Sequence, residues 1–138
     1  EIIHDTPEIK VYRDFAHSPS KLQATVKAAI EQFDGFKKIG AFELHTFSSL
    51  NASFLSQYHS SMKGLDVAIV YYNAHVFELK KMEMLDAKLV ENAFENVVVI
   101  NDKPTLVEAL KKAVSPKCVV LLMSSGNFDA LAVNDFLA

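Results

Sequence analysis

The stretch Ile9–Phe33, IKVYRDFAHSPSKLQATVKAAIEQF, combines a strand pattern, a helix start and a helix pattern. Residues 9–15 are rich in β-branched and aromatic side chains, which predicts a strand. Ser18 followed by Pro19 is typical of a helix start, because serine caps free backbone N–H groups and proline fits the first turn. Five apolar residues follow at helical spacing: Leu22, Val26, Ala29, Ile30 and Phe33. We therefore predict a helix over 19–33.

The rest of the chain repeats this alternation. Further strands are predicted at 37–44, 66–72, 96–101 and 119–123, and further helices at 54–62, 85–94, 104–114 and 128–137. Apolar strands separated by amphipathic helices are typical of a parallel sheet covered on both faces. Residues 1–4 are expected to pair with 9–12 and add one antiparallel edge strand. The predicted fold class is α/β, a three-layer sandwich of about six mostly parallel strands.

Composition excludes several classes of protein. A length of 138 residues suits one domain, and 50% hydrophobic with 22% charged residues indicates a globular chain. Acidic residues outnumber basic ones, 17 to 14, and form no basic stripe, so nucleic acid is not an expected partner. No apolar run approaches the ~18–20 residues that span a membrane. The start, Glu1-Ile2-Ile3-His4, has no initiator methionine or signal pattern, and we interpret it as a cut inside a longer chain.

The single cysteine, Cys118, lies in an apolar run and is expected to be a buried thiol. It cannot form an internal disulfide, which fits a reducing compartment such as the cytoplasm. The histidines and the cysteine show no zinc-ligand spacing, so no metal site is predicted. The chain also lacks the phosphate-binding pattern G-x-x-x-x-G-K-[ST] and the dinucleotide pattern G-x-G-x-x-G. We expect no nucleoside triphosphate to be held by this chain alone.

Three polar segments follow predicted strands, at 14–19, 45–49 and 124–127. Ligands bind at the carboxyl ends of parallel strands, and these ends share one edge of a sheet. The three segments are therefore expected to lie on a common rim. We refer to them as the first, second and third corners.

The candidate residues of the first two corners are ionisable. Asp14 and His17 could form a pair in which the carboxylate raises the imidazole pKa, or Asp14 could cap a turn beside a solvated His17. His45 could donate to a ligand carboxylate or phosphate, or it could simply end its strand. Ser49 belongs to a serine-rich segment expected to cap the next helix.

The third corner contains Ser124, Ser125, Gly126 and Asn127, and the predicted helix from Phe128 follows it. A glycine allows close approach of the backbone to a ligand, and the start of a helix attracts anions. A plain turn with a helix cap explains the same residues equally well. A serine hydrolase using Ser124 or Ser125 would need a nucleophile elbow such as G-x-S-x-G, which is absent.

Motifs at these corners resemble those of the Mur ligase family. Residues 11–19, VYRDFAHSP, resemble the pattern V-Y-D-D-[FY]-[AG]-H-[HS]-P that opens the family's C-terminal domain. Residues 42–45, FELH, resemble its F-[QE]-P-[HR] loop, and residues 121–128, LLMSSGNF, resemble its closing loop. The resemblance covers nearly the whole chain. It implies a Rossmann-like domain without the nucleotide fingerprint.

The resemblance also implies a function. Mur ligases build peptidoglycan precursors in the bacterial cytoplasm: ATP and Mg²⁺ activate a carboxylate of the UDP-N-acetylmuramate substrate as an acyl phosphate, and an incoming amine displaces phosphate. Two further domains, for the UDP substrate and for ATP, would belong to the same chain. Asp14 and His17 would face the nucleotide and the reacting groups. The remaining candidates, His45, Ser49, Ser124, Ser125, Gly126, Asn127 and Phe128, would line the pocket for the amino acid or peptide.

The branch of the family depends on departures from its motifs. The Asp-Phe-Ala-His run most resembles the murein peptide ligase, with the UDP-N-acetylmuramate–L-alanine ligase as the alternative. Arg13 replaces an aspartate, and Thr46 and Ser49 replace arginines that would hold an amino-acid carboxylate. These changes favour a peptide substrate. A stand-alone module of the receiver or flavodoxin kind shares the strand pattern and is the alternative outside the family.

Overall fold

The computed structural model describes residues 1–44, 52–73 and 87–137, and its strands form one six-stranded sheet. The strand order is β1-β2-β6-β3-β4-β5. The strands are β1 (Ile2–Asp5), β2 (Ile9–Asp14), β3 (Lys37–Glu43), β4 (Val67–Tyr71), β5 (Val98–Ile100) and β6 (Cys118–Met123). All neighbouring pairs are parallel except β1 and β2, which are antiparallel. The predicted fold class and the antiparallel edge strand are confirmed.

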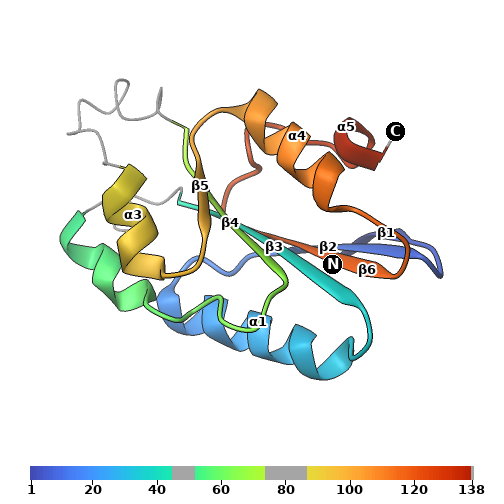
Figure 1. Ribbon diagram of the computed structural model, residues 1–138, viewed down its shortest axis with the longest axis horizontal. Coiled ribbons are helices and arrows are strands. Elements are labelled where there is room, and N and C mark those ends of the chain that lie inside the picture. Colours follow the sequence, from blue (N-terminus) through green and yellow to red (C-terminus); the bar gives the residue numbers. More distant parts are fainter. Residues whose placement is uncertain (45–51, 74–86, 138) are drawn as a thin grey trace.

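Helices cover both faces of this sheet (Figure 1). The helices are α1 (Pro19–Gln32), the 3₁₀-helix η1 (Ala52–Tyr58), α3 (Ala87–Phe94), α4 (Lys103–Ala113) and α5 (Asn134–Leu137). Residues of α1, η1 and α3 pack into the core on one face, and residues of α4 and α5 pack into the core on the other. The arrangement is the predicted three-layer sandwich.

Local sequence accounts for where α1 and α4 begin. Ser18 accepts a hydrogen bond from the Lys21 amide, and proline stands in the first turn of α1. Asp102 caps α4 in the same way, accepting from the Thr105 amide at 2.8 Å and from its hydroxyl at 2.8 Å. The hydrogen bonds from Thr105, first from its side chain and then from its backbone, lower the pKa of Asp102. Both starts follow the carboxyl ends of strands, so they lie along the predicted rim.

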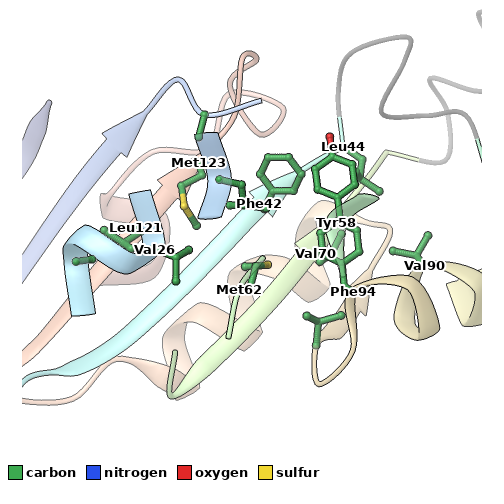
Figure 2. Close-up of a cluster of buried hydrophobic side chains, with 14 of the residues drawn as sticks. Val26, Phe42, Leu44, Tyr58, Met62, Val70, Val90, Phe94, Leu121 and Met123 are labelled. Carbon is green, nitrogen blue, oxygen red and sulfur yellow. The ribbon is translucent and has the colours of Figure 1, made fainter. Parts of the chain in front are cut away.

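An aromatic cluster forms the centre of the core on the α1 face (Figure 2). Tyr58 stacks on Phe94 with ring centroids 4.8 Å apart, and the Phe42 centroid lies 5.3 Å from that of Tyr58. These rings come from β3, η1 and α3, so their packing fixes three elements relative to one another. Burial raises the pKa of Tyr58 to about 12.

Three elements differ from the predictions. The segment at 54–62 begins as a 3₁₀-helix and continues as turns, in place of an α-helix. Strand β5 is shorter than predicted, and Val98 is 56% exposed because β5 lies at the edge of the sheet and is not the buried strand expected there. The helix predicted over 128–137 is wrong for its first half, since α5 covers only Asn134–Leu137.

Two expectations from composition have direct counterparts in the structure. Cys118 is buried and unpaired within β6, as predicted. In the part of the chain that the structure describes, no helix is both long and apolar enough to cross a membrane.

Candidate functional site

The first and third corners meet at the carboxyl edge of the sheet. Strand β6 lies between β2 and β3, and Met123 is level with Asp14 on one side and with Phe42 on the other. The Ser124 amide donates a hydrogen bond to the Asp14 carbonyl at 2.9 Å. The strand that leads into the second corner ends at the same level. The convergence predicted for the strand ends is therefore seen in the described residues.

Asp14 organises the first corner through its side chain. Its Oδ1 accepts hydrogen bonds from the Ala16 amide at 2.8 Å and from the Thr25 hydroxyl at 3.3 Å. The carboxylate thus ties the end of β2 to helix α1 and caps the turn between them. A hollow of about 320 Å³ beside the corner is lined by Asp14 and Thr25, among others. The turn-capping role considered for Asp14 is the one that the structure shows.

His17 is exposed, and its ring contacts the carbonyl of Phe15. Its Nδ1 lies 3.0 Å from the Phe15 carbonyl, which can only accept, so Nδ1 is the donor in this hydrogen bond. The Tyr58 hydroxyl donates to the His17 carbonyl at 3.1 Å and anchors the backbone here. In the described residues, no hydrogen bond or ion pair joins the Asp14 carboxylate to the His17 ring.

Phe15 stands between these two residues and is 75% exposed. Single exposed apolar side chains are common on protein surfaces, so the exposure of Phe15 by itself indicates no function. Its position beside Asp14 and His17 adds an apolar contact to a polar corner. Sequence reasoning did not single it out.

The second corner lies mostly outside the described residues. His45, Thr46 and Ser49 fall in the segment 45–51, and the caps predicted there fall in it too. The described chain reaches the rim through Glu43 and Leu44, whose amide donates to the Tyr71 carbonyl at 2.9 Å. The structure therefore describes the strand end that leads into this corner, but not the candidate side chains of the corner.

The third corner is held by a buried carboxylate from β3. Glu43 Oε1 accepts from the Ser124 hydroxyl at 2.7 Å and from the Phe128 amide at 2.9 Å. The Ser124 oxygen in turn accepts from the Gly126 amide at 2.7 Å. Glu43 is 5% exposed and Ser124 4%. Ser124 and Phe128 thus anchor the loop inside the domain, while the residues between them reach the surface.

No helix begins at this corner, so the structure shows a plain turn there and not the helix start that was expected from Phe128. Phe128, Asp129 and Ala130 have φ values of 52°, 55° and 61°, which form a left-handed turn. The Ala130 amide donates to the side chain of Asn127 at 3.2 Å. The physical reason is tertiary: the loop satisfies its amides through Glu43 and Asn127 in place of an α-helical ladder.

A second contact fixes the same turn from β4. The Tyr71 hydroxyl donates to the Asp129 carboxylate, and the Tyr71 ring stacks on Phe128 at a centroid distance of 6.1 Å. Burial raises the pKa of Tyr71 well above its ordinary value. The hydrogen bond to Asp129 and the negative charges of Asp129, Glu43 and Asp102 raise it further. A phenol in this setting stays protonated and remains a donor.

The residues that sequence reasoning missed are the ones that act across the sheet: Glu43, Tyr58 and Tyr71. A signal for Glu43 was present in the sequence, because one charged residue interrupts the apolar run 39–44. Buried charges need hydrogen-bond partners, so such a residue indicates a polar contact at the strand end. Nothing comparable marks the two tyrosines, whose rings suit a core equally well.

The first corner carries two ionisable side chains. Asp14 and His17 offer a carboxylate and an imidazole nitrogen, and the sequence has no glycine-rich phosphate loop. No group of three or more histidine, cysteine or acidic residues within ranges 1–44, 52–73 and 87–137 could hold a metal ion. The Asp14 carboxylate and the His17 imidazole do not form a phosphate cradle.

Comparison with known proteins shows the family of the chain. Residues 1–126 match the family model of the Mur ligase glutamate ligase domain. UDP-N-acetylmuramate–L-alanine ligases are among the relatives: that of Acetivibrio thermocellus is 30% identical over 86% of this chain and 26% of its own length. That of Crocosphaera subtropica is 28% identical over 86% of this chain and 24% of its own. The chain spans about a quarter of the length of these relatives.

Solved structures share the fold. A murein peptide ligase from Psychrobacter arcticus has a TM-score of 0.72 at 17% identity, over 94% of this chain and 27% of that one. A domain described as part of a UDP-N-acetylmuramate:L-alanyl-γ-D-glutamyl-meso-diaminopimelate ligase from Haemophilus ducreyi has a TM-score of 0.69 at 20% identity. The match covers 94% of this chain and 90% of that one, so the related domain folds by itself. With the family model matched over 126 of its residues, this chain belongs to the Mur ligase C-terminal, or glutamate ligase, domain family.

Proposed function

We propose that this chain is the C-terminal domain of an ATP-dependent ligase of peptidoglycan precursors. The enzyme would join an amino acid or peptide to UDP-N-acetylmuramate, with the UDP substrate and ATP bound mainly by two other domains. The observation that carries the proposal is the joined rim, where the Ser124 amide bonds to the end of β2 and its hydroxyl bonds to the end of β3. Separate polar segments thus form one surface at the place where α/β domains bind ligands.

The rim divides into two parts with different chemistry. Asp14, Phe15 and His17 present a carboxylate, an exposed ring and an imidazole, and we assign them to the nucleotide and the reacting groups. We assign His45, Ser49 and the loop from Ser124 to Phe128 to the amine substrate. ATP supplies the activation of the substrate carboxylate, and the rim excludes water from the activated group when the domains close.

Two observations support a ligand site that this chain does not complete by itself. The chain has no phosphate loop, and it spans about a quarter of the length of its curated relatives. The surface of the rim also carries Phe15, whose exposed ring suits an apolar contact with another domain. We therefore expect the isolated chain to bind ATP weakly or not at all, and to be inactive by itself.

Two related amine substrates are considered, L-alanine and a tripeptide. The curated relatives are named as L-alanine ligases, and one of the solved structures is named as a murein peptide ligase. An L-alanine carboxylate would be held by cationic side chains that bind it through two hydrogen bonds, and Thr46 and Ser49 have no such group. We therefore favour the tripeptide L-alanyl-γ-D-glutamyl-meso-diaminopimelate.

The test is ligation by the enzyme that contains this chain. ADP release is measured with UDP-N-acetylmuramate, ATP and Mg²⁺, in the presence of the tripeptide or of L-alanine. We expect ADP release to depend on the amine and to be faster with the tripeptide. Faster release with L-alanine would move the enzyme to the alanine branch. Micromolar ATP affinity of the isolated chain in calorimetry would contradict the incomplete site and favour a stand-alone module.

A further inference from the structure

We infer that Glu43 is a positioning residue: its buried carboxylate joins the ends of β3 and β6 and fixes the loop that receives the amine substrate. The claim that this loop receives the amine substrate rests on the proposed function. The contacts of Glu43 rest on the structure alone. Glu43 was not among the residues predicted to form the site. It does not reach the surface of the rim, since only 5% of the residue is exposed.

A single oxygen holds both ends of the loop. Glu43 Oε1 accepts from the Ser124 hydroxyl at 2.7 Å and from the Phe128 amide at 2.9 Å. These two partners lie 81 and 85 residues further along the chain than Glu43. Three residues lie between these anchors, and they are the exposed or half-buried part of the corner: Ser125, Gly126 and Asn127. The position of these three residues is therefore set by a side chain of a different strand.

The loop needs such an anchor because its backbone is not in a relaxed conformation. Three consecutive non-glycine residues after Asn127 have left-handed φ values, which are unfavourable for residues with a side chain. Hydrogen bonds to an ionised acceptor are stronger than neutral ones, and a buried carboxylate persists only when it is hydrogen-bonded. The carboxylate and the strained loop therefore stabilise each other.

The same residue stands at the base of the second corner. Strand β3 continues from Glu43 through Leu44 directly into His45. The Leu44 amide is bonded to the Tyr71 carbonyl, and the Tyr71 hydroxyl is bonded to Asp129 of the third corner. The end of β3 and the loop of the third corner are thus joined at Glu43 and again through Tyr71. Loss of the carboxylate should disturb the amine site without touching Asp14 or His17.

The experiment compares three variants in the enzyme that contains this chain. Glu43→Leu keeps the approximate volume and removes both acceptors, whereas Glu43→Gln keeps one carbonyl oxygen that can take both bonds. Asp66→Ala is the matched control, because Asp66 also accepts from a backbone amide, that of Lys38 at 2.7 Å, but at the opposite edge of the sheet. The probes are the tripeptide L-alanyl-γ-D-glutamyl-meso-diaminopimelate and L-alanine, with KM measured separately for amine and for ATP.

We expect Glu43→Leu to raise the KM for the ligated amine about tenfold and to change the KM for ATP less than about twofold. Glu43→Gln should recover most of this loss, and Asp66→Ala should resemble the wild type. If Glu43→Leu does not fold, Ser124→Ala removes one of the two bonds and should shift the amine KM in the same direction by about threefold. An unchanged amine KM in the folded Leu variant, or no recovery in Glu43→Gln, would overturn the inference.

A second measurement separates this inference from the proposed function. Amide hydrogen exchange of Phe128 and Gly126 is followed in the 138-residue chain, whose relative from Haemophilus ducreyi folds as a separate domain. Both amides should be protected in the wild type and in Glu43→Gln, and should exchange faster in Glu43→Leu. If the enzyme shows no ligation but the exchange pattern is as expected, the anchoring role of Glu43 is supported and the proposed function is contradicted. Equal protection in all three chains would overturn the anchor whatever the enzyme does.

Discussion

The first and third corners lie side by side on the rim, yet they are held in opposite ways. At the first corner, Asp14 bonds an amide two residues away, and Ser18 caps an amide three residues away. At the third corner, the loop depends on Glu43 and Tyr71, which are 58 to 85 residues away in the chain. One corner is built by its own segment, and the other is built by its neighbours in the sheet.

The difference bears on how each corner can contribute to function. The turn that leads into α1 is capped by a residue of its own segment, so it forms whenever the helix forms. His17 therefore lies in a stable turn. The third corner forms only when β3, β4 and β6 are already paired, because its partners come from those strands. We expect substitutions at the third corner to affect stability strongly, and those at the first corner to affect it weakly.

The largest expected effect on stability is that of Ser124→Ala. The change removes the hydroxyl that donates to Glu43 and accepts from Gly126, and it leaves a buried carboxylate with one fewer donor. We expect the free energy of unfolding to fall by about 2–3 kcal/mol. Urea unfolding measures it, with Ser61→Ala as the control, since that buried hydroxyl makes one bond, to the Tyr58 carbonyl. Equal losses in the two variants would show that the third corner is not specially dependent on distant partners.

Tyr58→Phe tests a side-chain contact that reaches the first corner from a distant part of the chain. Loss of the bond to the His17 carbonyl should cost about 1 kcal/mol at neutral pH. The pKa of Tyr58 is raised from 10.0 to about 12, so between these pH values the unfolded chain releases a proton that the folded chain keeps. The stability from this group is complete below pH 10 and is lost as the pH rises toward 12.

The free energy of unfolding should accordingly fall less steeply between pH 10 and 12 in Tyr58→Phe than in the wild type. Guanidinium unfolding at a series of alkaline pH values gives both slopes. Parallel slopes would mean that Tyr58 titrates alike in the folded and unfolded chain.

A smaller effect is expected for Ser18→Ala. The cap bond to Lys21 is long, at 3.4 Å, and it is exposed, so its loss should cost about 0.5–1 kcal/mol. Thermal or urea unfolding of the chain provides the value. A loss as large as that of Ser124→Ala would remove the distinction between the two corners.

The same contrast explains what could be predicted from the sequence. The strand and helix at 9–33 were predicted closely because periodicity, cap and proline all belong to one short segment. The final helix was predicted too long, because the spacing of Phe128, Leu131 and Phe136 suits a helix. The structure instead turns left-handed at 128–130, where bonds to Glu43 and Tyr71 replace helical ones.

The candidate site was predicted in outline for a topological reason. Parallel strands bring their carboxyl ends together, so the joining of the first and third corners followed from strand order. The contacts between them could not be read from local spacing. Glu43 was visible as a charge in an apolar strand, whereas its partners Ser124 and Phe128 became known only from the fold.

The most direct test of the account is the His17→Ala enzyme. His17 is exposed and makes its ring contact only with a neighbouring carbonyl among the described residues, so its loss should change the free energy of unfolding by less than about 0.5 kcal/mol. If the rim completes the ligase site, kcat should fall on the order of 100-fold in the amine-dependent ADP assay. An unchanged kcat in a stably folded variant would contradict the assignment of the first corner to the reacting groups.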